Sequence, residues 1–254
     1  MAGFQQVKVN RDLEFVGAAK YQPNVKGPMM TELKVFDELF VAATSNDWNE
    51  QEAHGSAITH TALDGGAMLI TCNGSADMDC GELSQTAQWS PYFNCGMEAK
   101  VKLSQVTAVG IAIGFVNAKN ATDNHIAGEL NSSNVITTPG TTTDAALFIF
   151  DTASSPDVWY YGAIKAGTPG TAVAAVGSLV PVADTYFKVR IQTDSNGNVL
   201  LYYNGIPVGR LFTATTGALA HLVTSMLTPY VGFISRSTAN PVCTISRITT
   251  WQDN

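Results

Sequence analysis

The clearest pattern of apolar and polar positions lies in residues 186–210, where the two kinds of residue alternate. The apolar positions of its first part are Phe187, Val189 and Ile191. A period of two indicates a strand with one buried face. Residues 194–197 (Asp-Ser-Asn-Gly) and Asn204-Gly205 then supply turn residues, and Asn-Gly favours a type I′ turn because both central residues need positive φ. We therefore predict a three-stranded antiparallel meander.

Further short apolar segments follow one another along the chain, separated by turn residues. Residues 95–103 alternate, and their odd positions from 97 to 103 are predicted to face the core. Residues 108–116 are apolar at both odd and even positions, which predicts a central strand covered on both faces. Residues 218–226 have the spacing of one or two helical turns. The other predicted strands are 67–72, 82–89, 144–151, 157–165, 173–182, 229–235 and 242–251.

Many short strands, almost no helix and no internal repeat predict an all-β fold, an antiparallel β-sandwich or jelly roll. A chain of 254 residues is an ordinary length for one such domain. We assign the jelly roll to residues 45–254 and an extended N-terminal arm to residues 1–44.

The predicted arm differs from the rest of the chain because chain breakers interrupt it at 21–24 and 27–28. Residues 29–40 have the apolar content of a short helix or an edge strand. Two interpretations remain open: an arm that packs on another subunit or lattice, or a strand that runs along the same domain. Under the first, the predicted interface residues are the large apolar ones, Phe4, Phe15, Tyr21, Phe36 and Phe40.

Composition and charge exclude several classes of partner. The net charge is −7, only 14% of residues are charged, and no basic stripe is present, so we expect no nucleic-acid partner. The first 15 residues lack the apolar run of a signal peptide. The longest apolar run, 106–116, is too short to span a bilayer, so we expect no membrane partner and synthesis in a reducing cytoplasm.

The cysteines, at 72, 80, 95 and 243, have no C-x-x-C spacing, and the four histidines are scattered singly. This arrangement predicts no zinc site and favours buried thiols that behave as small apolar groups. The alternative for Cys72 and Cys80 is a bridge that closes the intervening loop under oxidising conditions.

The stretch DTYFKVRIQTDSNGNVLLYYNGIPVGR, residues 184–210, resembles the concanavalin A-like lectin/glucanase superfamily, which includes laminin-G-like jelly rolls. In that family an aromatic residue opens a strand that reads K/R-V-x-I, and a D-x-x-G turn and Y-x-N-G follow. The last predicted strand fits the family's pairing of the final strand with the first ones. The resemblance covers residues 45–254 and implies the fold, which hosts lectins, glycosidases, adhesion modules and viral structural domains.

A glucanase of this superfamily would carry E-x-D-x-x-E on one face of a strand, because the acid and the nucleophile must flank one glycosidic bond. The nearest match is Asp77-Met-Asp79-Cys-Gly-Glu82, which begins with Asp and contains a glycine in a turn-rich stretch. We therefore predict no catalytic residues and no enzyme. Asp77 and Asp79 are the candidate metal ligands, for a calcium ion that Asn73 would help to hold; the alternative is a solvated acidic loop. No other cofactor is expected.

Two further stretches are candidates for ligand contact. The aromatic runs 159–161 and 202–203 could stack on sugars, but they lie on predicted strands, which favours packing in the core. The polar segment 117–143 predicts a long loop with one small strand near Val135, and long loops in compact domains are often functional.

These observations lead to a prediction by analogy and exclusion: a non-enzymatic virion structural protein. The chain is similar in type to the head decoration (cement) proteins of tailed bacteriophages. That similarity implies a place on the capsid surface, the major capsid protein or other virion subunits as partners, and a homo-oligomer such as a trimer. The alternative is a carbohydrate-binding, lectin-like module for host-surface glycans, with a glycoside hydrolase as a third class.

Overall fold

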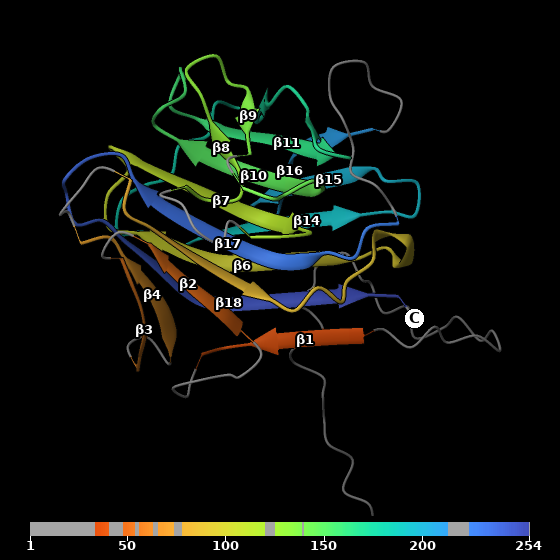
Figure 1. Ribbon diagram of the computed structural model, residues 1–254, viewed down its shortest axis with the longest axis horizontal. Helices are drawn as coiled ribbons and strands as arrows, with labels where there is room; N and C mark the ends of the chain where they lie inside the picture. The colour runs from red at the N-terminus through yellow and green to blue at the C-terminus, as the bar shows by residue number, and fades with distance from the viewer. Residues whose placement is uncertain are drawn as a thin grey trace, which may run out of the picture.

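Two antiparallel eight-stranded sheets pack face to face in the computed structural model (Figure 1). The structure describes residues 34–40, 48–53, 56–62, 66–73, 78–119, 125–138, 140–212 and 224–253. Sheet A contains β1 (Lys34–Glu38), β3 (Ala57–Thr61), β4 (Ala67–Thr71), β6 (Gly96–Leu103), β14 (Phe187–Thr193), β15 (Val199–Tyr203), β16 (Ile206–Leu211) and β18 (Val242–Gln252). Sheet B contains β2 (Trp48–Ala53), β5 (Cys80–Gln85), β7 (Val109–Val116), β10 (Ala145–Asp151), β11 (Trp159–Lys165), β12 (Thr168–Pro169), β13 (Val173–Ala174) and β17 (Thr228–Ser235).

The strand orders are those of an antiparallel sandwich, so the predicted fold class is confirmed. Sheet A runs β16-β15-β14-β6-β18-β4-β3, with β1 on the same side of the long strand β18 as β4. Sheet B runs β12-β11-β10-β7-β17-β5-β2, with β13 beside β11. A 3₁₀ turn, η3 (Pro91–Phe93), and a small hairpin, β8 (Glu129–Leu130) with β9 (Ile136–Thr137), complete the described regular structure.

The predicted meander is confirmed as β14, β15 and β16. Its strands pair antiparallel, and Val189 lies opposite Tyr203 in the register. Asn204 has φ 49° and Gly205 has φ 81°, the two positive values that the Asn-Gly turn was expected to need. Phe187 and Ile191 are buried and face the core, as the alternation predicts.

Strand β7 is buried along its whole length, as predicted, because sheet A covers one face and the segment 125–138 covers the other. Ile126, Leu130 and Ile136 of that segment pack on outward-facing side chains of β7, β10, β11 and β17. Residues 125–138 of the predicted long loop therefore cover the outer face of sheet B. Its strands are β8 and β9, close to the predicted position near Val135.

The structure differs from the predictions at several elements. Strands β2 and β3 were not predicted. The segment 173–182 forms only the two-residue strand β13, and the strand predicted at 82–89 spans Cys80–Gln85. Most of the predicted helix at 218–226 lies outside the described residues. None of the described segments forms a helix that could cross a lipid bilayer.

The end of the predicted arm that the structure describes, residues 34–40, packs within the sandwich. β1 pairs with β18, and the ring of Phe36 lies 6.2 Å from that of Trp48. Phe40 is 3% exposed and its ring centre is 5.8 Å from that of Trp48. Of the two interpretations, a strand along the same domain describes these residues. Phe4, Phe15 and Tyr21 lie outside the described residues.

All four cysteines are buried and none forms a disulfide, which confirms the prediction of buried thiols. Burial raises the pKa of the Cys72, Cys80 and Cys95 thiols to about 12. The thiolate is the reactive form. We therefore expect no thiol to react with a disulfide reagent at pH 8 in the native protein, and all four to react in denaturant. Rapid native labelling of any one thiol would contradict this arrangement.

Candidate functional site

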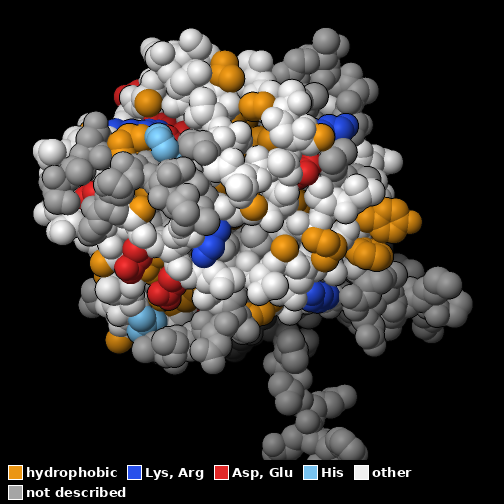
Figure 2. All heavy atoms as spheres, viewed as in Figure 1, with side chains coloured by type: hydrophobic (Ala, Val, Ile, Leu, Met, Phe, Trp, Pro, Cys, Tyr) orange, Lys and Arg blue, Asp and Glu red, His pale blue; other side chains and the backbone are white. Residues whose placement is uncertain are grey.

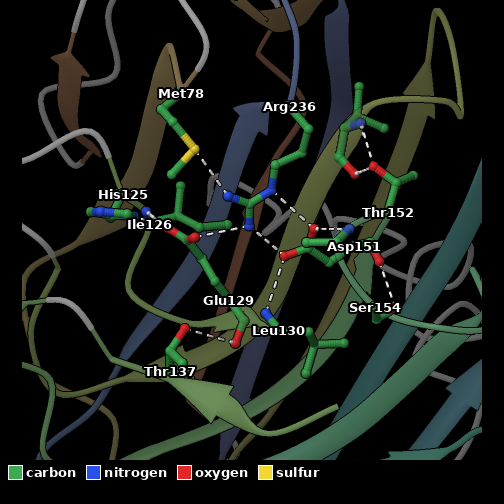
Figure 3. A network of polar contacts seen from close by, with 12 residues as sticks. Met78, His125, Ile126, Glu129, Leu130, Thr137, Asp151, Thr152, Ser154 and Arg236 are labelled. Atoms are coloured by element: carbon green, nitrogen blue, oxygen red, sulfur yellow. Dashed lines mark hydrogen bonds and ion pairs between the residues drawn. The ribbon is translucent and has the colours of Figure 1, made fainter. Parts of the chain in front are cut away.

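The described residues place their main group of buried charges on the outer face of sheet B, under the segment 125–138 (Figure 3). Asp151 is the last residue of β10, Glu129 begins β8, and Arg236 follows β17. Arg236 Nε and Nη2 lie 3.0 and 2.5 Å from the two carboxylate oxygens of Asp151, and Nη2 lies 2.8 Å from Glu129 Oε2. One guanidinium thus joins the sheet to the segment that covers it.

Backbone N–H groups of the covering segment and the β10–β11 loop complete the carboxylate contacts. Asp151 accepts hydrogen bonds from the N–H of Leu130 at 3.1 Å and of Ala153 at 3.0 Å. Glu129 Oε1 accepts from the N–H of Ile126 at 2.9 Å and lies 3.0 Å from His125 Nδ1. These bonds tie both carboxylates to the backbone around them and fix the position of the segment.

Burial alone would lower the pKa of the Arg236 guanidinium. The hydrogen bonds and charges of Asp151 and Glu129 outweigh burial, so the pKa is raised above its ordinary value. The guanidinium therefore stays charged and acts as a fixed cation between two fixed anions.

A second buried polar group lies nearby, where the Tyr230 hydroxyl donates a hydrogen bond to Glu82 Oε1. The N–H of Ala127 contacts the same two oxygens, at 2.8 Å from Glu82 and 2.9 Å from Tyr230. Burial, followed by the charge of Glu82, raises the pKa of Tyr230 well above its ordinary value. Position 232 must be glycine, because a Cβ there would lie 2.1 Å from Tyr230 Oη.

A hollow of about 500 Å³ opens to solvent beside Arg236. Its apolar lining is Met78, Ala108 and Ala153, and its polar lining is Thr107, Thr152, Asp157 and Arg236. Arg236 Nη1 lies 3.2 Å from Met78 Sδ, and Asp157 is an exposed member of the lining. The hollow thus offers a carboxylate acceptor, hydroxyls and a guanidinium edge beside small apolar groups.

The nearest match to a glucanase motif does not form an accessible carboxylate pair. Asp79 is fully buried and Glu82 is 1% exposed. Glu82 lies beneath the covering segment, bonded to Tyr230, where no substrate reaches it. Asp77 lies outside the described residues.

The calcium hypothesis for Asp77 and Asp79 finds no support in the described part of the chain. The carboxylate oxygens of Asp79 have no hydrogen-bond partner among the described residues. Within the described ranges no three side chains of His, Cys, Asp or Glu are grouped to hold a metal ion. Asp77 lies outside the described residues, so the calcium site stays a prediction from the sequence.

The aromatic runs pack mainly in the core, as the sequence favoured. Trp159, Tyr160 and Tyr161 are all buried. The ring of Tyr203 stacks on Phe187 with centres 5.7 Å apart. Tyr202 lies on the outer face of sheet A, with the Arg190 guanidinium 3.8 Å from its ring centre.

Sequence reasoning missed Arg236, Glu129 and Asp151 as a group. Arg236 follows Asp151 by 85 residues and Glu129 by 107 residues, so no local spacing joins the arginine to the two acids. One signal was present: Asp151 ends an apolar run in which a charge is unexpected, and buried charges require partners.

Comparisons with known proteins identify the fold. No family model and no curated protein sequence matches the chain. Among solved structures, a protein of unknown function, SO2946 from Shewanella oneidensis MR-1, aligns with a TM-score of 0.57 and 12% identity over 100% of this chain and 96% of its own. The Emp47p carbohydrate recognition domain aligns at 0.58 with 11% identity over 90% and 100%. Lectin UEA-II complexed with galactose aligns at 0.56 with 10% identity over 87% and 99%. The chain therefore has the lectin-like jelly-roll fold that its meander resembles.

Proposed function

We propose that this protein is a non-catalytic carbohydrate-binding module and that it binds a neutral sugar in the hollow beside Arg236. The observation that carries the proposal is the lining of that hollow, which combines polar and small apolar side chains, is open to solvent and is held in place by the Arg236 ion pairs. Two structural neighbours are a carbohydrate recognition domain and a lectin complexed with galactose, which supports the same class.

The charge of the hollow favours a neutral ligand over an anion. Arg236 is already neutralised by Asp151 and Glu129, and Asp157 adds an exposed negative charge. A sugar hydroxyl can donate to the Asp157 carboxylate, whereas an anionic group would be repelled by it. Ala108 and Ala153 leave room for the apolar face of a pyranose ring.

A binding role rather than a catalytic one is supported by the state of the carboxylates. Asp151, Glu129 and Glu82 are buried and already accept hydrogen bonds from backbone N–H groups, Arg236 or Tyr230. Glycoside hydrolysis needs two carboxyl groups that flank one substrate bond. Asp157 is the one acidic residue among those that line the hollow.

The test is a glycan array probed with the full-length chain, followed by calorimetry on any neutral glycan that binds. Asp157→Asn keeps the size of the side chain but removes its charge. We expect it to weaken binding by about 10–100-fold, since a hydrogen bond to a charged group contributes about 1.5–3 kcal/mol. Glu50→Gln is the matched control, because it removes an exposed carboxylate on β2, outside the hollow, and should leave affinity unchanged. An array without neutral ligands, or equal binding by Asp157→Asn, would refute the proposal.

The capsid-decoration role, with a major capsid protein as partner on a virion surface, stays a prediction from the sequence. Neither the fold nor its neighbours test a contact with a viral shell, and the lectin-like alternative has the better support. A virion protein that binds host glycans would satisfy both.

A further inference from the structure

Positive charge gathers on the outer face of sheet A, on the other side of the sandwich from the Arg236 hollow. β14, β6 and β18 lie side by side there and carry one carboxylate, Glu98. Their cations are Lys100, Lys102, Lys188, Arg190 and Arg247, of which Arg247 is paired with Asp37 of the neighbouring strand β1. The whole chain has a net charge of −7, and charged side chains are sparse on the face seen in Figure 2. This local excess of cations runs against the overall charge.

Two of these cations share one tyrosine ring. Lys100 Nζ lies 4.5 Å from the centre of the Tyr186 ring, and Lys102 Nζ lies 4.9 Å from it. Within the described ranges no carboxylate lies within 4.0 Å of either ammonium group. Two like charges brought together in this way repel each other, and an anion placed between them would relieve that repulsion.

A hollow of about 300 Å³ lies at this place, a volume at the lower end of ligand sites. It is lined by Lys100, Tyr186, Phe187, Lys188 and Asn204. In the register of β14 with β6, Lys188 stands directly opposite Lys100. Lys188 Nζ is 3.5 Å from Glu98 Oε1, so Glu98 neutralises Lys188.

Asn204 contributes a fixed donor at the rim. Its Oδ1 accepts from the N–H of Lys188 at 2.8 Å, and its own N–H donates to the Lys188 carbonyl at 2.9 Å. Because Oδ1 already accepts this hydrogen bond, the amide Nδ2 is the side-chain atom of Asn204 that can donate to a ligand. Lysine ammonium groups are donors without acceptors. The hollow therefore presents donors and positive charge, the reverse of the hollow beside Arg236.

We propose that the Lys100–Lys188–Asn204 hollow binds the carboxylate of an acidic sugar, such as a uronic acid residue. The anionic part of this assignment rests on sheet A alone, and the sugar part rests on the proposed function. The carboxylate lies beside Lys100, which has no carboxylate within 4.0 Å among the described residues, and ring hydroxyls face Lys188, Asn204 and the edge of Tyr186. The module then binds a neutral sugar in the hollow beside Arg236 and an acidic sugar in the Lys100–Lys188–Asn204 hollow on the opposite face.

The experiment titrates the full-length chain with glucuronate, glucose and acetate, and follows binding by NMR. We expect glucuronate to bind, and acetate and glucose to bind at least about tenfold more weakly, because each supplies only part of the contacts. Raising NaCl from about 50 to about 300 mM should weaken glucuronate binding several-fold, since salt screens exposed charges.

Two variants test the assignment of residues. Lys100→Gln and Lys188→Gln should each weaken glucuronate binding by about tenfold, the loss expected for one charge-assisted contact. Arg210→Gln is the matched control: Arg210 is an exposed cation of β16 that stacks on Phe212, at 4.7 Å from its ring centre, outside the hollow. Circular dichroism of each variant shows whether the fold is retained.

The outcomes separate this inference from the proposed function. Lysine-dependent glucuronate binding supports the acidic site even when the array shows no neutral ligand. Neutral binding that depends on Asp157, without glucuronate binding, overturns the acidic site alone. Acetate that binds as tightly as glucuronate overturns the sugar assignment, and equal glucuronate binding by Lys100→Gln overturns the location.

Discussion

Replacing Arg236 with methionine is expected to lower the free energy of unfolding by about 3–5 kcal/mol. Methionine keeps much of the side-chain length but removes the charge, which leaves Asp151 and Glu129 buried without their cation. The side chains of these two acids are only 1% and 5% exposed, so water cannot replace the guanidinium. The measurement is urea denaturation followed by circular dichroism.

The chain offers a matched control in a second arginine–aspartate pair. Arg247 contacts both carboxylate oxygens of Asp37, at 2.8 and 2.6 Å, but these side chains are 23% and 29% exposed. Solvent reduces the value of such a pair, so Arg247→Met should cost about 1 kcal/mol or less. Equal losses for the two variants would show that burial does not set the value of the Arg236 ion pairs.

A combined variant separates the loss of ion-pair attraction from the cost of leaving a buried charge without its partner. Adding Asp151→Asn and Glu129→Gln to Arg236→Met removes all three charges while keeping similar shapes. We expect the triple variant to regain a large part of the lost stability, because the main cost of the single change is the uncompensated buried charge. A triple variant less stable than the single one would assign the cost to packing instead.

The sequence predicted the centre of the fold better than its edges, for a physical reason. Strands such as β6 and β14 have neighbours on both sides and a buried face, so selection of apolar residues leaves a visible period. β2 is an edge strand with the sequence WNEQEA, and Trp48 is its one buried residue. Its strand conformation comes from pairing with β5, which a one-dimensional pattern does not contain.

Residues 173–182 show the opposite difference: their apolar content predicts a strand, but only two of these residues form one. This segment is rich in valine, yet Val176 is 71% and Val182 is 63% exposed. Because no sheet covers these side chains, only Val173 and Ala174 pair, with Tyr161 and Tyr160. Strand propensity measures how a side chain fits a half-buried sheet surface, so it fails where that surface is missing.

The sequence likewise shows some residues of the candidate sites but not how the fold brings them together. Lys100, Lys102 and Lys188 were visible as the polar positions of two alternating strands, but only the register places Lys188 opposite Lys100. Arg236 belongs to no pattern at all, and its meeting with Glu129 depends on how a loop crosses a sheet. Local chemistry can be read from the residues, whereas a site built from distant segments requires the topology.

Trp159→Ala is expected to lower the free energy of unfolding by about 3–5 kcal/mol, the range for removing a large aromatic side chain from a core. Trp159 is fully buried at the start of β11, and its ring stacks on Phe148 with centres 4.6 Å apart and planes 3° apart. It also contacts Phe187 and Tyr203 of the meander, at 5.5 and 6.1 Å. The indole thus joins sheet B to sheet A, so its loss leaves a cavity between the sheets.

Two variants define how much of that loss is packing between the sheets. Trp159→Phe keeps a ring against Phe148 and should cost about 1–2 kcal/mol, because a smaller cavity remains. Tyr92→Ala removes a ring of similar kind from the surface, where Tyr92 is 62% exposed and lies edge-on to Phe93 at 5.3 Å, and should cost less than about 0.5 kcal/mol. If Trp159→Ala were as mild as Tyr92→Ala, the two sheets would not depend on the indole for their contact, and the aromatic cluster that joins the meander to β10 and β11 would have to be held by other core residues.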